Sequence, residues 1–408
     1  MKPAAKKVSL AVLFCLAVVV IVAAILLHPY YAMPPESKEA LEAKLAEYQK
    51  VGSAMQDRPK AGRQALDALI KDSKPIDTKK PEQPWVESCP AYSLDHFKKL
   101  EPQMSAFLAF DSRFRALVDH GLVIQQDFSF ESDLLHFSGL RWLTYWENGA
   151  AVLDLQQGRR NEAMQRFHTV LRLTASLFQT PTLIYCMIGV ALEMNVDKAL
   201  IHLLPQLNPA EMEQLKGWLA ELPDSNKAIV TAMEVETASF VGAIDREGNP
   251  EPGDTSGDPL SIIRTLPGGA FGDFFFHHKT LSRVVVWLAR NTGYLRRERS
   301  MFVSLASREI EAAQTWSASG VNDAYHSPLT GKEIMHSMCF AIAWPNYTAL
   351  LGKTTDNMRR RQALIKAMEL ELQRRAKRQQ TFELPYDAEH HIVVKPEYGC
   401  IVKNEGGQ

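Results

Sequence analysis

Residues 139–207 decide the fold. They begin Gly139-Leu-Arg-Trp-Leu-Thr-Tyr-Trp-Glu-Asn and continue through apolar residues at helical spacing to a turn at Gly158. Two further helical runs follow, Asn161–Leu177 and Thr182–Leu204. In the first of these runs the apolar residues form one stripe with a period of about 3.6 residues. The other faces of that helix carry three arginines: Arg160, Arg166 and Arg172. The stretch predicts three consecutive helices, with Asn161 capping the second, and therefore an all-α protein.

Small and bulky residues in this block recur at fixed intervals, first at Gly158, Ala163, Phe167 and Leu171. The pattern resembles the second half of a tetratricopeptide repeat, in which two helices approach closely. A similar spacing returns near that family's period of about 34 residues, at Ala199, Leu203 and Leu207. The first-helix signature departs from the family pattern, because Trp146 is one place out and the Gly-x-x-Tyr is missing. The resemblance implies a body of helical hairpins with two degenerate repeats; an ordinary helical bundle is the alternative.

The composition excludes several classes of protein. The 408 residues include 46 basic and 47 acidic side chains, so no overall positive field favours nucleic acid as a partner. Five cysteines are too few for a disulfide-built scaffold of this length. Cys186 lies in an apolar helical run and is expected to behave as a small core residue. Cys89 and Cys400, in segments flanked by proline and glycine, are the plausible disulfide partners, and whether they pair is left open.

The N-terminus predicts a membrane anchor. Residues 1–7 carry three lysines, and Val8–Leu27 is a run of 20 residues without a charge. A helix of that length spans about 30 Å, the thickness of the hydrocarbon core of a bilayer. The lysines should remain cytoplasmic, which places the body in the periplasm of a bacterium, tethered to the inner membrane by a single pass. A cleaved signal peptide is the alternative, but its apolar region would be shorter, about 7–15 residues. In addition, Tyr30 occupies a position where cleavage needs a small residue.

The rest of the chain divides by composition. After the cytoplasmic residues 1–7 and the anchor at 8–27, we expect five parts: a stalk and linker at 28–90, a helical repeat-like domain at 91–245, an acidic Gly/Pro loop at 246–259, a second helical subdomain at 260–380, and a C-terminal tail at 381–408 that contains a short β-hairpin. Asn208, followed by Pro209 and Glu211, predicts a helix start. Long helices are expected at 331–351 and 357–380.

No common catalytic signature is present. The sequence lacks a phosphate-binding glycine loop, a His-Glu-x-x-His helix, a Cys-x-x-Cys pair and a Gly-x-Ser-x-Gly elbow. This argues against the common nucleotide-binding proteins, zinc proteases and hydrolases. No cofactor or small-molecule ligand is predicted.

Four side chains are candidates for catalysis: Glu193, Glu234, His277 and His278. The two glutamates lie on apolar helices, where an ionised carboxylate is costly unless it is paired or its pKa is raised. Asp273 and His277 would share a helical face and are candidates for metal ligands. The structural alternative for the glutamates is a buried ion pair, with Arg141 or a histidine as the partner.

The last predicted helix carries many basic residues over 358–378, which suit either an anionic membrane surface or a solvated face. The leading hypothesis is a membrane-tethered extracytoplasmic helical scaffold for protein–protein interaction or envelope assembly, with the bilayer and a protein as its partners. The alternative is an enzyme with a carboxylate/histidine site in the helical core. In one version of this hypothesis the site binds a metal ion.

Overall fold

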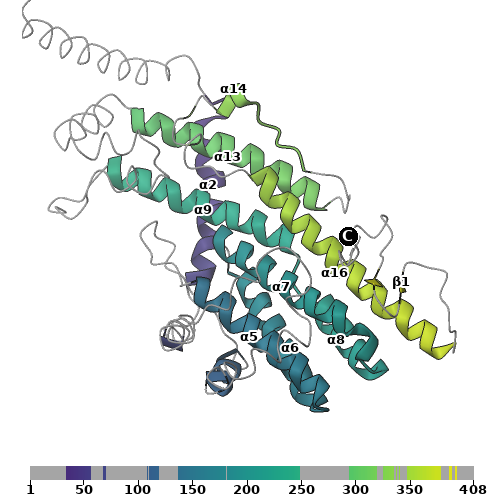
Figure 1. Cartoon of the computed structure of the whole chain (residues 1–408). Helices are drawn as coiled ribbons and strands as arrows, with labels where there is room; N and C mark the ends of the chain where they lie inside the picture. The colour runs from purple at the N-terminus through teal and green to yellow at the C-terminus, as the bar shows by residue number, and fades with distance from the viewer. Residues whose placement is uncertain are drawn as a thin grey trace, which may run out of the picture. The chain divides into compact units, whose positions relative to one another are not determined.

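The computed structural model shows an all-α fold, as the sequence predicts. It describes residues 34–56, 68–69, 108, 110–118, 137–180, 182–248, 294–318, 325–334, 337, 340, 347–377, 386–387 and 391–392. The elements in chain order (Figure 1) are α2 (Lys38–Gln56), α5 (Phe137–Gln156), α6 (Arg160–Phe178), α7 (Leu183–Leu203), the 3-10 turn η3 (Leu204–Gln206), α8 (Pro209–Glu221), α9 (Ser225–Gly248), α13 (Tyr294–Ala318), α14 (Gly331–Ile334), α16 (Tyr347–Ala376), β1 (Tyr386–Asp387) and β2 (His391–Ile392). A further helical stretch, named here the 110–118 helix, precedes α5.

Short turns join α5, α6 and α7. Gly158 has φ of 78°, the left-handed conformation that glycine adopts without steric cost, and it ends the first of these helices. The next helix begins one residue earlier than predicted, and its N-cap is Arg159, which makes no side-chain cap hydrogen bond. The predicted cap at Asn161 is therefore wrong. The cap at Asn208 is confirmed: its side chain accepts from Glu211 N, and the Glu211 carboxylate accepts from Asn208 N.

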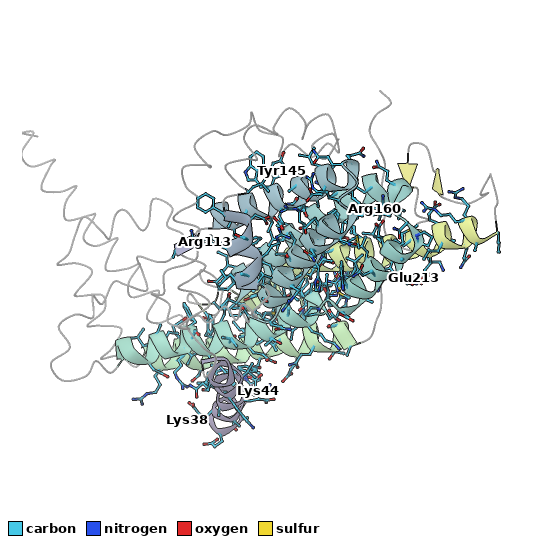
Figure 2. All side chains as sticks on the ribbon, turned by 90° about the horizontal axis from the view of Figure 1, so that it is seen from below. Lys38, Lys44, Arg113, Tyr145, Arg160 and Glu213 are labelled. Carbon is cyan, nitrogen blue, oxygen red and sulfur yellow. The ribbon has the colours of Figure 1, made fainter. Side chains whose placement is uncertain are left out.

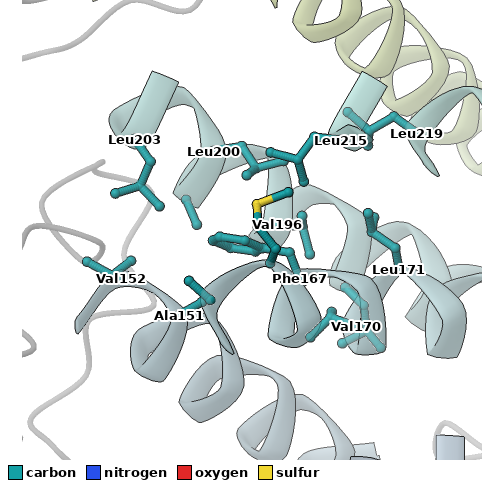
Figure 3. Close-up of a cluster of buried hydrophobic side chains, with 14 of the residues drawn as sticks. Ala151, Val152, Phe167, Val170, Leu171, Val196, Leu200, Leu203, Leu215 and Leu219 are labelled. Carbon is teal, nitrogen blue, oxygen red and sulfur yellow. The ribbon is translucent and has the colours of Figure 1, made fainter. Parts of the chain in front are cut away.

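Helix α5 is the centre of one compact unit. Every residue from Leu143 to Leu155 is buried, so this helix has no face on solvent over that length. It packs against α6 and α7, and α6 also packs against α8. Figure 3 shows the Phe167 ring among aliphatic side chains of three other helices. A helix buried on all faces must satisfy its own polar side chains inside the protein.

A second compact unit is formed by parts of α2, α9, α13 and α14 with Phe340. Its core holds a chain of aromatic contacts, in which the Phe302 ring stacks on Phe240 and meets Phe340 edge-on. Leu41 and Leu45 of α2 are buried in the same core. The segment predicted to be a stalk therefore contributes a packed helix to this unit.

Several boundaries differ from the predictions. Helix α9 continues to Gly248, into the start of the predicted loop at 246–259. The helix predicted at 331–351 is interrupted, since α14 ends at Ile334 and Ser337 is not helical. The last helix, α16, begins ten residues before the predicted start at 357. β1 and β2 form an antiparallel pair of two-residue strands, while most of the predicted hairpin lies outside the described residues.

The predicted anchor at 8–27 also lies outside the described residues. Within the part of the chain that the structure describes, no helix combines the length and apolar character needed to cross a membrane.

Two helical glycines provide a matched test of the packing. A Cβ on Gly189 of α7 would lie 2.9 Å from Cε1 of Phe178, whereas a Cβ on Gly217 of α8 would meet nothing within 4 Å. Gly217→Ala should raise the free energy of unfolding by about 0.5–1 kcal/mol, because alanine loses less backbone entropy in a helix. Gly189→Ala should be less stable than Gly217→Ala by about 1–3 kcal/mol, because the ring must shift. Urea unfolding of the full chain measures both, and equal gains would contradict the described packing of α6 on α7.

Candidate functional site

Glu193, the first of the predicted catalytic residues, is fully buried on α7 and held by two side chains of α16. Arg361 donates to both carboxylate oxygens, from Nε at 2.5 Å and from Nη2 at 2.7 Å. Asn357 donates from Nδ2 at 2.6 Å. The remaining Arg361 donor, Nη1, reaches the carbonyl oxygens of Leu222 and Pro223 just beyond α8, at 3.0 and 3.1 Å. The expected ion pair exists, but its partners are Arg361 and Asn357 rather than Arg141 or a histidine.

A second carboxyl lies one turn further along α7. Asp197 is 3% exposed, and neither of its oxygens has a hydrogen-bond partner among the described residues. Burial and the neighbouring Glu193 charge raise the pKa of Asp197 well above its ordinary value, while Arg361 and Arg360 oppose that rise. The surroundings of Asp197 therefore disfavour a second negative charge beside Glu193.

A larger network surrounds Arg166. The Nη1 atom of this buried side chain lies 2.9 Å from Oδ2 of Asp111 and 3.0 Å from Oε2 of Glu147. Its Nε donates to Oδ2 of Asp154 at 2.7 Å. One guanidinium group thus joins α6 to α5 and to the 110–118 helix. Arg115 supports the same network, donating to Asp111 at 2.8 Å.

Glu147 is the most enclosed member of this network, with no exposed surface. Burial raises the pKa of Glu147 well above its ordinary value; the Arg166 charge opposes the rise, and the neighbouring Asp111 charge adds to it. Burial lowers and the facing carboxylates raise the pKa of Arg166, with a net rise that keeps it charged. Glu147 and Asp111 therefore form a carboxyl pair around one arginine.

This network was not predicted from the sequence, in which Arg166 lies on a face of its helix away from the apolar stripe. Arg166 is in fact 5% exposed, because α6 is covered on that side by the 110–118 helix. The available signal was the spacing of Glu147 and Asp154, which stand two turns apart on one face of a helix that is apolar over most of its length. Two acids on a fully buried helix require a cation on a neighbouring one.

Glu234, the second predicted glutamate, is only half-buried and belongs to the other compact unit. It accepts a hydrogen bond from Nε2 of Gln314 at 2.7 Å. Burial raises the pKa of Glu234, and the bond from Gln314 opposes the rise. Each predicted glutamate is thus engaged by partners within its own unit.

The remaining predicted site residues, Asp273, His277 and His278, lie outside the described residues. Across the residues that the structure does describe, no three His, Cys, Asp or Glu side chains gather as metal ligands would. Cys186 is buried, as predicted; Cys89 and Cys400 are outside the described part.

The basic helix predicted at 358–378 corresponds to the second half of α16, and its charges are largely paired. Arg361 points into the core, and Arg374 and Arg375 both donate to the buried Glu371, at 2.7 and 2.6 Å. Lys366 lies 3.2 Å from Glu369. These pairs reduce the positive field available to an anionic membrane surface.

Comparison of the chain with protein-family models, with curated proteins and with solved structures finds no match.

The enclosure of Glu193 leads to a stability prediction. Glu193→Gln should lower the free energy of unfolding by about 3–5 kcal/mol, because it leaves Arg361 charged and buried without its anion. The matched control is Glu369→Gln on α16, which removes the half-exposed partner of Lys366 on the same helix. This variant should lower the free energy of unfolding by less than about 1 kcal/mol.

Replacing both members of the buried pair, Glu193→Leu with Arg361→Met, should cost less than Glu193→Gln alone, since no buried charge is stranded. Urea denaturation of the full chain measures all three variants. A small, similar loss for the Glu193 and Glu369 variants would contradict the described burial of the pair.

Proposed function

We propose that the chain is a membrane-tethered helical scaffold that binds a protein partner outside the cytoplasmic membrane. The tether and the location are inferred from the sequence: the uncharged run Val8–Leu27 follows three lysines and precedes the helical body. We favour a protein as the partner over a nucleotide or a nucleic acid. The sequence has no phosphate-binding glycine loop, and its net charge is not positive.

The observation that carries the proposal is the enclosure of Glu193. The strongest catalytic candidate in the sequence has no exposed surface and gives both oxygens to Arg361 and Asn357. Arg361 also ties the end of α8 to α16. A carboxylate engaged in this way fixes three helices relative to one another. Such rigidity suits a scaffold, because its binding surface keeps one shape.

A second helix-joining pair lies nearer the surface. Arg160 at the start of α6 donates to both carboxylate oxygens of Glu211, at 2.6 and 2.5 Å. The same carboxylate completes the capping box of α8. The α6–α8 junction is therefore held by one acid with two functions, and this favours a body of rigidly stacked helices, as repeat-like scaffolds have.

The surface that would meet a partner is polar. Among the described residues, Leu108 is the one exposed large hydrophobic side chain. Charged side chains project outward instead, for example Lys38 of α2 and Glu213 of α8 (Figure 2). We infer that the partner is recognised through charged and hydrogen-bonding groups on these outer faces.

Topology tests the tether. Protease added to intact spheroplasts should digest the body while an epitope placed at residues 1–7 stays protected, and permeabilised cells should lose both. Protection of the body in intact spheroplasts would contradict the proposal. So would its release as a soluble form beginning near Met33.

Photo-cross-linking in intact cells tests the scaffold. A photoreactive residue at the exposed Glu213 or Lys38 should yield a discrete adduct with another protein, while the same residue at the buried Leu215 should yield none. The double variant Glu193→Leu with Arg361→Met should keep the adduct, because a scaffold needs this pair only for its fold. Absence of adducts at exposed positions on both units would argue against a protein-binding scaffold, and loss of the adduct in a folded double variant would assign Glu193 a direct role.

A further inference from the structure

We propose that a proton on Glu147, which faces Asp111 across one nitrogen of Arg166, holds the 110–118 helix on α5 and α6, and that loss of this proton releases the helix. This goes beyond the proposed function and does not depend on it, because it concerns only the network around Arg166.

The network holds more carboxyls than guanidinium groups. Among the described residues its carboxyls are Asp111, Glu147, Asp154 and the half-exposed Glu162, and its guanidinium groups are Arg115, Arg166 and the half-exposed Arg159. Four carboxyls thus face three cations, so one carboxyl is in excess. Glu147 has no exposed surface, and a proton on it removes the excess charge where water cannot.

Asp111 and Glu147 also share a single nitrogen atom of Arg166. Oxygens of Asp111 and Glu147 both lie within 3.0 Å of Nη1 of Arg166. The other oxygen of each carboxyl, Oδ1 and Oε1, has no hydrogen-bond partner among the described residues. A proton on one carboxyl supplies the missing donor and permits a hydrogen bond between the two groups.

The cations around Glu147 are shared with other carboxyls. Asp111 and Arg115 face it from the 110–118 helix and Arg166 faces it from α6, with Nε of Arg115 3.9 Å from Oε1 of Glu147. Asp154, on the same helix as Glu147, contacts Nε of Arg166 and is also paired with Arg159 at the rim. Arg115 also pairs with Asp111 and Glu162, at 2.8 and 3.0 Å, so its charge is divided among three carboxyls.

The consequence for docking follows from where the two acids sit. Asp111 belongs to the 110–118 helix and Glu147 to α5, so repulsion between their charges acts across that contact. Phe114 and Val118, fully buried, hold the 110–118 helix to the core by apolar contact alone once the polar link is lost.

The pH dependence has a definite sign. Because burial raises the folded pKa of Glu147 above its unfolded value, its contribution to stability is present below the ordinary pKa of a glutamate. That contribution is lost as the pH rises through the folded pKa. Between the ordinary and the folded pKa, docking of the 110–118 helix should weaken by up to about tenfold for each pH unit, and above the folded pKa it should change no further.

Hydrogen exchange of the full chain at pH 6 and pH 9 tests the proposal, with exchange times scaled for the intrinsic rate at each pH. Amides of the 110–118 helix should exchange at least about tenfold faster at pH 9 in the wild-type chain. In Glu147→Gln they should be equally protected at both values, because the amide keeps the shape and neutrality of the protonated acid. Amides of α8, which has no part in the network, serve as the internal control.

Three results would overturn the proposal. The first is equal protection of the wild-type 110–118 helix at both pH values. The second is the same loss of amide protection at pH 9 in Glu147→Gln as in wild type. The third is failure of Glu147→Gln to fold, since a neutral amide should replace a neutral acid without loss of stability.

Discussion

The constraint on which the rest of the structure depends is the burial of α5 on every face. A helix in this position cannot turn its charges to water, so Glu147 and Asp154 must be neutralised where they stand. Arg166 contacts both of them, with Arg159 also paired to Asp154, and in doing so Arg166 ties α6 and the 110–118 helix to α5. The arrangement of this unit therefore follows as much from satisfying two acids as from covering apolar surface.

Helix α7 also carries two buried acids, and their surroundings differ. Both carboxylate oxygens of Glu193 accept hydrogen bonds from Arg361, whereas burial and the Glu193 charge raise the pKa of Asp197. A buried pair of this kind adds little net stability compared with apolar residues, but breaking it is costly, so it penalises other helix arrangements. We regard these pairs as the reason why an apolar bundle adopts one packing, and that rigidity is what the proposed scaffold needs.

Local features of this fold could be predicted from sequence, and long-range ones could not. The helix start at Asn208 was predictable because its signal lies within four residues of the cap. The need of Glu193 for a cation was predictable from its apolar neighbours, but its identity was not, because Arg361 stands 168 residues further along the chain. Arg166 was predicted to lie away from the apolar stripe because hydrophobic periodicity assigns every charged side chain to the polar face of a helix. Periodicity alone therefore does not identify a buried cation.

The central claim is that the acids of this core are neutralised in place, and Glu147 tests it most directly. Carbon-13 NMR of the side-chain carboxyls in the full chain, with the Glu147 resonance identified by its loss in Glu147→Gln, reports the protonation state of this one group. The account predicts a carboxyl whose pKa lies well above the ordinary range of a glutamate. Titration near the ordinary glutamate value of about 4.3 would contradict it.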